Sequence, residues 1–147
     1  MDQIEDFVRA SGLDIPSYDV CFFGGPEVAD AILDSVLCGK KCANTGLQSL
    51  YDGAMEPLPK VGDYSIIVNS AMEPKCITRI TKVEFVTFEN ITEEYAAAEG
   101  EMSLADWKEK HRKYFEDCCR EVGITFSEQM HCVCEYFEVV YRKSMLS

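Results

Sequence analysis

The chain has 147 residues, a net charge of −12 and 47% hydrophobic residues, which is the composition of a globular domain large enough to bury a core. Its 26 acidic and 14 basic side chains create a mean field that repels a phosphate backbone, which argues against broad non-specific binding to nucleic acid. No segment approaches the roughly 18 apolar residues of a membrane span, and the acidic start lacks the features of a signal peptide. We therefore expect one cytoplasmic domain over residues 1–147, without a membrane partner.

Eight cysteines raise the question of a disulfide scaffold or a metal site. The chain is long for a disulfide scaffold, and Cys118 and Cys119 are adjacent, whereas structural zinc sites use gaps of about two to four residues. Cys132 and Cys134 share one face if their segment is a strand, so we expect them to pack in the core. The sequence thus predicts reduced thiols, no metal ligands and no cofactor.

The first half of the chain contains two predicted helices and two predicted strands. The spacing of apolar residues predicts a short helix over 1–12 and a second helix that has Pro26 at its first position and an apolar stripe over 28–37, and Gly39 is placed to end it. A brief apolar piece that closes with glycines separates the two helices. After a turn at 57–63, branched and aromatic residues predict a strand over 64–69 and a long strand over 75–88.

The second half predicts helices over 92–100 and 103–123 and a closing strand over 131–141. His111 lies on the apolar stripe of the long helix, where a core histidine with satisfied polar atoms is favoured over a ligand-binding one. Strands that do not alternate regularly with helices indicate an α+β domain around a small, mostly antiparallel sheet or barrel.

Two lysines and two acidic residues are the candidates for a binding site. Lys40 and Lys41 follow the glycine that ends the second helix, so they either balance the helix dipole or begin a basic pocket. Glu99 ends an alanine-rich helix, where the dipole disfavours a carboxylate, so it is either an ordinary exposed glutamate or has a separate function. Asp63 stands before a predicted strand, and a plain turn is the favoured interpretation.

Four stretches of the sequence, taken together, carry a family resemblance. They are SVLCGKK (35–41), PLPKVGDYSIIV (57–68), FENITEEYAAAEGEMSLADWKEKH (88–111) and VCEYFEVVY (133–141). Over about residues 21–141 the chain resembles the ASCH domain family, in its small stand-alone bacterial branch. This resemblance implies a PUA-like fold, in which helices flank a small β-barrel with a ligand cleft at its mouth. It also implies binding of RNA, nucleotides or modified nucleosides.

Some members of that family hydrolyse the amide of acetylated cytidine, and at least one relative resembles a metal-dependent ribonuclease. In the amidohydrolases a GxK motif supplies a lysine base, a threonine three residues further on is the nucleophile, and a glutamate completes the set. Carried over by motif, the lysine falls on Lys41, the glutamate on Glu99 and the threonine on Asn44. A carboxamide cannot act as that nucleophile. The alternative nucleophiles are Cys42 and Thr45, and Thr45 faces away from Asn44 if the segment is extended.

Three hypotheses follow from the residues and the resemblance. The leading one is a barrel-mouth pocket that binds its ligand through Lys40, Lys41, Asn44, Asp63 and Glu99. The first alternative is an amidohydrolase that uses Lys41 and Glu99 with Cys42 or Thr45, and the second is a ribonuclease with a divalent ion on Glu99 and Asp63. The missing threonine favours binding over hydrolysis, but whether the chain is an enzyme stays open. We expect a small nucleotide, a nucleoside or single-stranded RNA as partner, and a monomer or weak homodimer.

Overall fold

The computed structural model describes residues 2–25, 27–100 and 102–142. Its centre is a five-stranded sheet with the strand order β1-β3-β4-β5-β2. The strands are β1 (Asp19–Cys21), β2 (Ala43–Leu47), β3 (Tyr64–Val68), β4 (Pro74–Thr87) and β5 (His131–Arg142). The β1–β3 pair is parallel and the other three pairs are antiparallel, so β1 and β2 form the two open edges.

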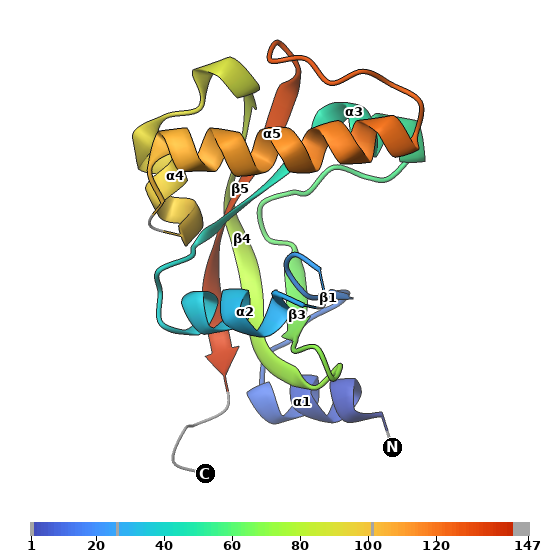
Figure 1. The fold of residues 1–147 in the computed structure, drawn as a ribbon. Helices are drawn as coiled ribbons and strands as arrows, with labels where there is room; N and C mark the ends of the chain where they lie inside the picture. The colour runs from blue at the N-terminus through green and yellow to red at the C-terminus, as the bar shows by residue number, and fades with distance from the viewer. Residues whose placement is uncertain (1, 26, 101, 143–147) are drawn as a thin grey trace.

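The sheet curls into a half-barrel around the long pair β4 and β5 (Figure 1). Register shifts interrupt the pairing of β4 with β5 at two points and the pairing of β3 with β4 at one point. Such irregularities bend a strand and increase its twist, which explains how one sheet can wrap around several helices. The predicted α+β architecture around a mostly antiparallel sheet is confirmed.

In the part of the chain that the structure describes, five α-helices cover the sheet, and one short 3₁₀ helix connects β4 to the helices that follow. They are α1 (Gln3–Ser11), α2 (Ala29–Leu37), α3 (Gln48–Ala54), the 3₁₀ helix Phe88–Asn90, α4 (Glu93–Gly100) and α5 (Leu104–Glu121). Among the described residues, every helix and strand predicted from the sequence is present within a few residues, whereas β1, β2 and α3 are additions. Pro26, the predicted first position of the second helix, lies outside the described residues. None of the helices in the described ranges is long and apolar enough to cross a membrane.

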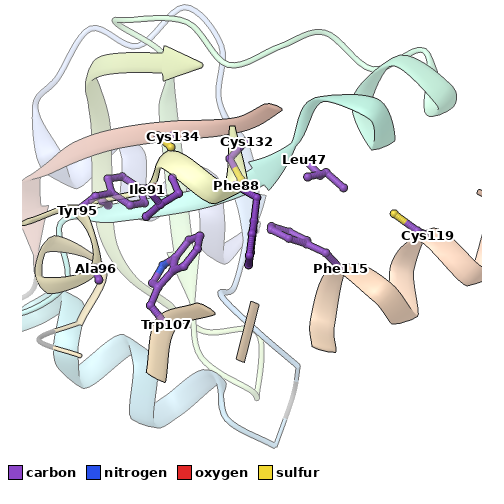
Figure 2. Close-up of a cluster of buried hydrophobic side chains, with 11 residues drawn as sticks. Leu47, Phe88, Ile91, Tyr95, Ala96, Trp107, Phe115, Cys119, Cys132 and Cys134 are labelled. Atoms are coloured by element: carbon purple, nitrogen blue, oxygen red, sulfur yellow. The ribbon is translucent and has the colours of Figure 1, made fainter. Parts of the chain in front are cut away.

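The largest cluster of buried side chains joins α4 and α5 to β2 and β5 (Figure 2). Cys132 and Cys134 project into it from one face of β5, as predicted, and all eight cysteines of the chain are free thiols. The ring of Phe88 lies between those of Trp107 and Phe115, with centroid separations of 5.5 and 6.4 Å. This cluster fixes α5 on the sheet.

Helix α2 packs against the opposite face of β5. Its Leu33 and Val36 contact Phe137, which alternates with Cys134 along the strand and therefore projects to the other side. Helix α1 covers a third region, where Phe7 packs on β3 and β4. As a result, α2 and α5 lie on different faces of the sheet, close to the edge that β2 forms.

The edge strand β2 presents different residues to these two faces. Ala43, Thr45 and Leu47 are buried, whereas Asn44 and Gly46 are only partly buried. The buried set belongs to the face covered by α4 and α5 because side chains alternate along a strand. The expectation that Asn44 and Thr45 point to opposite faces is therefore confirmed.

The packing of α5 gives a first prediction. Phe115 is 1% exposed and contacts Phe88, whereas the next residue, Glu116, is exposed. The substitution Phe115→Ala should lower the free energy of unfolding by about 3–5 kcal/mol, because it removes a core ring and leaves a cavity. Glu116→Ala should change it by less than about 0.5 kcal/mol. Urea denaturation of both variants measures the difference, and similar midpoints would contradict the assigned face of α5.

Candidate functional site

A pocket of about 570 Å³ opens over the edge strand β2, between α2 and α5. Its lining combines aromatic and apolar side chains near α2 with polar side chains from β2, α4 and α5. These residues are Phe22, Phe23, Gly24, Ala31, Ile32, Ser35, Lys41, Asn44, Thr45, Glu99, Gly100, Met102, Lys110, His111 and Tyr114. The volume lies within the range of small-ligand sites.

Helices α4 and α5 each direct two side chains toward the same part of the pocket wall. Tyr95 and Glu99 of α4 are four residues apart and so share a face, as do Trp107 and His111 of α5. All four of these side chains take part in one hydrogen-bonded network that also includes Thr45 of β2. The carboxylate of Glu99 lies at its centre.

Both carboxylate oxygens of Glu99 are bound by donors from the protein. The Nζ atom of Lys41 lies 3.0 Å from Oε1. Oε2 accepts hydrogen bonds from Oγ1 of Thr45 at 2.5 Å and from Nε1 of Trp107 at 2.6 Å. Nε2 of His111 lies 2.9 Å from the same oxygen. The side chain of Glu99 is only 5% exposed, so the alternative of an ordinary exposed glutamate is wrong.

These donors keep Glu99 ionised despite its burial. Burial by itself would raise the pKa of the carboxyl, but the hydrogen bond from His111 and the charge of Lys41 oppose it. Together with the hydrogen bond from Thr45, they lower the pKa of Glu99 to about 2. Glu99 is therefore a carboxylate throughout the neutral range, and a weak proton acceptor.

Lys41 occupies the coil between α2 and β2 and is held at both its backbone and its ammonium group. Its backbone N–H donates to the carbonyl of Ser35 at 3.0 Å. Nζ donates to the carbonyl of Ala43 at 2.7 Å, to the carbonyl of Glu99 at 3.3 Å and to its carboxylate at 3.0 Å. The ammonium also lies 5.4 Å from the centre of the Phe23 ring. All three ammonium hydrogens are thus used within the protein, and the alternative of a simple helix-dipole partner is wrong for this lysine.

A chain of hydroxyl groups leads from α4 to the Glu99 carboxylate. The hydroxyl of Tyr95 lies 2.7 Å from Oγ1 of Thr45 and 2.8 Å from the carbonyl of Asn44. Thr45 donates its single proton to Glu99, and the single proton of the Tyr95 hydroxyl is donated to the carbonyl of Asn44 or to Oγ1 of Thr45. Burial strongly raises the pKa of Tyr95, which keeps this hydroxyl protonated.

The structure places Thr45, and not Asn44, against Glu99 and Lys41. The family motif counted three residues from Lys41 and reached Asn44, but β2 begins at Ala43 and only its odd-numbered residues face α4. A hydroxyl is therefore present beside the Lys41–Glu99 pair. The sequence argument that the nucleophile position is lost does not apply to this geometry.

Asn44 also lines the pocket, from the other face of β2. Its partner across the ladder is Glu135 of β5, whose side chain accepts a hydrogen bond from Asn44. Burial raises the pKa of Glu135, although this hydrogen bond and the charge of Lys41 partly oppose the shift. The carboxyl of Glu135 thus orients the Asn44 amide at the edge of the pocket.

Three further residues proposed from the sequence are not among the pocket-lining residues of the described chain: Lys40, Cys42 and Asp63. Lys40 and Cys42, the two neighbours of Lys41 in the sequence, are exposed. The carboxylate of Asp63 accepts the backbone N–H of Lys60 at 2.9 Å, which is the plain turn that the sequence favoured. Its position gives no support to a metal shared between Asp63 and Glu99.

The described residues contain no group of three or more histidine, cysteine, aspartate or glutamate side chains placed to hold a metal ion. Glu99 meets four protein donors, which occupy the oxygens that a cation would need. The donor set therefore does not fit the metal-dependent alternative, and we do not pursue it.

Sequence reasoning missed the functional setting of α5. Both ring nitrogens of His111 have partners within the protein, as the sequence favoured, but the side chain is 16% exposed and also lines the pocket. Trp107, expected only to pack, is fully buried and also donates to Glu99. The four-residue spacing of these two side chains was the available signal, since it places two N–H donors on one helix face.

The chain can now be compared with known proteins. The family model of the ASCH domain matches residues 19–141. The protein belongs to the ASCH domain family. An ASCH domain from Lactobacillus crispatus has 32% sequence identity and a TM-score of 0.90, over 97% of this chain and 96% of that one. A protein from Enterococcus faecalis has 32% identity and a TM-score of 0.84, over 93% of this chain and 85% of that one. Among curated proteins, none matches the chain significantly.

These comparisons confirm the predicted family and its α+β, PUA-like fold. The sheet of this ASCH domain is a curled half-barrel with two open edges, one of which carries the pocket. The family match also spans the coil, β2, α4 and α5 that build the network around Glu99.

The lowered pKa of Glu99 gives a prediction about stability. A carboxylate with a folded-state pKa of about 2, against an ordinary value of about 4.5, stabilises the fold above pH 4.5, and this contribution is lost as the pH falls toward 2. The full contribution is roughly 3 kcal/mol, of which about 2 kcal/mol should be lost between pH 7 and pH 3. The variant Glu99→Gln should be less stable at pH 7 but should lose less stability on acidification.

Urea unfolding at pH 7 and pH 3 tests this expectation. Glu109→Gln, at an exposed position of α5, is the control and should keep the native pH dependence. Equal pH dependence in the native protein and in Glu99→Gln would show that Glu99 is not held in the ionised state by its partners.

Proposed function

We propose that the pocket between α2 and α5 binds a nucleotide, a modified nucleoside or the end of a single-stranded RNA. The observation that carries this proposal is the meeting of Lys41 and Glu99, 58 residues apart in sequence, at 3.0 Å in the pocket wall. A buried ion pair is weak evidence for stability, because desolvation offsets most of its Coulomb energy. Its place in the wall of this pocket therefore supports a role in binding.

The remaining lining suits a nucleobase. Phe22 and Phe23 lie on the α2 side, and Tyr114, which is 59% exposed, lies on the α5 side. Aromatic rings of this kind stack on bases of single-stranded RNA. The amide of Asn44 adds donors and an acceptor that can pair with the edge of a base. The link between ASCH domains and RNA binding supports the same ligand class.

Binding without fast chemistry agrees with the resting hydrogen bonds. Nζ of Lys41 donates to three acceptors within the protein, so it presents no lone pair to a ligand in this arrangement. Glu99 has a pKa of about 2 and is a poor proton acceptor at neutral pH. The site as observed is thus arranged to present charge and hydrogen-bonding groups.

Amide hydrolysis of an acylated cytidine is the second candidate, favoured by one specific contact. Oγ1 of Thr45 lines the pocket and lies 2.5 Å from Oε2 of Glu99. In such a reaction the Thr45 oxygen would bond to the acyl carbon while its proton passes to Glu99. The cytosine amine would leave with a proton, and water would then release the acid from Thr45. Lys41 would stabilise the negative charge that develops on the acyl oxygen.

Binding can be tested with a matched pair of lysine variants. Titration of the native protein with cytidine, cytidine 5′-monophosphate and a short oligoribonucleotide, followed by calorimetry, should give saturable binding to at least one of them. Lys41→Met should weaken it about tenfold or more, because it leaves Glu99 without its cation. Lys40→Met should change it less than about twofold, since Lys40 is exposed. An equal loss of affinity in both variants would show that the ligand binds outside the pocket.

Hydrolysis of N4-acetylcytidine separates the second candidate from the first. If the reaction occurs, Thr45→Val should lower its rate by at least about a hundredfold, because the nucleophile is removed while the shape is kept. Cys42→Ala and Asn44→Ala should keep most of the rate. Release of cytidine, followed by chromatography, measures the three rates. Turnover that survives Thr45→Val would exclude this mechanism, and no turnover in the native protein would leave binding alone.

A further inference from the structure

Both ring nitrogens of His111 face groups that can only accept hydrogen bonds. Nε2 lies 2.9 Å from the carboxylate oxygen Oε2 of Glu99. Nδ1 lies 2.9 Å from the backbone carbonyl of Trp107, one turn earlier on α5. A neutral imidazole carries one N–H, so one nitrogen would turn a lone pair toward an acceptor. Only the imidazolium form satisfies both contacts.

The surroundings of His111 favour this cation. Its ring stacks on the indole of Trp107, with a centroid distance of 4.1 Å and an interplanar angle of 15°, and meets Phe115 edge-on at 5.8 Å. The face of an indole attracts a cation. The charged group of α4 that faces His111 is the carboxylate of Glu99. Lys41, from the coil before β2, binds the same carboxylate. Its charged neighbour on α5 that lines the pocket is Lys110.

An imidazolium at this place changes the charge of the pocket. Lys41 and His111 then contribute two positive charges to the wall against the single negative charge of Glu99, and the exposed Lys110 adds a third positive charge at the rim. The carboxyl of Glu135 is on the other face of the sheet and does not line the pocket. Its burial raises its pKa and so makes it harder to ionise. The pocket is thus locally cationic in a protein with a net charge of −12.

Excess positive charge in a mostly buried wall favours a ligand that brings negative charge. The side chains of Lys41 and His111 are only 7% and 16% exposed, so water screens them weakly. Their N–H groups are committed within the protein, so they supply the field and not the hydrogen bonds. The lining residues able to donate to an anion are the ammonium of Lys110, the hydroxyl of Ser35 and the amide of Asn44.

We infer that His111 is held as an imidazolium and that the pocket selects a ligand carrying a phosphate monoester over the corresponding neutral nucleoside. This inference rests on the proposed nucleotide or nucleoside pocket and names the chemical class of its ligand. A free nucleotide and the phosphorylated end of an RNA strand both supply this group. The acidic remainder of the protein confines the attraction to the pocket.

Calorimetric titrations at low salt test the selectivity. The probes are cytidine, cytidine 5′-monophosphate, and one short oligoribonucleotide with and without a 5′-phosphate. The phosphorylated form of each pair should bind about tenfold more tightly or better, and 0.5 M salt should remove most of that difference. The nucleotide pair reports on a free nucleotide and the oligonucleotide pair on an RNA end, so a preference in either pair supports the inference.

The two histidines of the chain provide matched variants. His111→Gln keeps an N–H that can reach Glu99 but removes the charge, so it should reduce the phosphate preference to less than about twofold while cytidine itself still binds. His131→Gln, at an exposed position of β5, should keep the full preference. Circular dichroism of His111→Gln checks that it remains folded. If that variant does not fold, Lys110→Gln at the exposed rim should still lower the preference severalfold.

Nuclear magnetic resonance of the imidazole nitrogens tests the charge directly. The native protein at pH 7 should show protons on both nitrogens of His111, and a neutral tautomer would overturn the inference. Equal binding of phosphorylated and unphosphorylated probes would also overturn it and leave the proposed pocket intact. Failure of every probe to bind would overturn both proposals.

Discussion

Three other segments of the chain meet the carboxylate that α4 contributes at Glu99. The coil before β2 contributes Lys41, β2 contributes Thr45, and α5 contributes Trp107 and His111. A buried carboxylate without these donors would cost several kcal/mol, so the surrounding elements must take up compatible positions for it to remain ionised. This constraint couples the placement of α4 and α5 to the edge of the sheet, and it forms the wall of the pocket at the same time.

Most of the fold could be predicted from the sequence because its elements are long and carry clear apolar patterns. The long strand over 75–88 and the helix over 103–123 are examples, and the structure has them as β4 and α5. The strands β1 and β2 and the helix α3 are three to seven residues long. Segments of that length do not contain enough repeats of a pattern to be distinguished from loops.

The site could be predicted only in part. Glu99 was accessible because the helix dipole opposes a carboxylate at that position, and Lys41 was accessible because two adjacent lysines follow the helix end within the GxK motif of the family. The choice between Asn44 and Thr45 was not accessible from motif spacing, since it depends on where β2 begins and hence on which residues face α4. Periodicity also could not show that the stripe of α5 borders a pocket at His111, because an apolar stripe looks the same against a core or a cavity wall.

The position of β2 at the edge of the sheet has a consequence for how the pocket could be retuned. Two adjacent residues reach the same cavity from opposite faces: the side chain of Thr45 is hydrogen-bonded to Glu99, whereas the side chain of Asn44 is hydrogen-bonded to Glu135. A change of side chain at position 44 can therefore alter which ligand edge is recognised without breaking the buried charge network, whereas a change at position 45 cannot. Position 44 is thus the part of the site that can be changed, and position 45 is the part that must be kept. A redesign of the ligand preference would begin at residue 44.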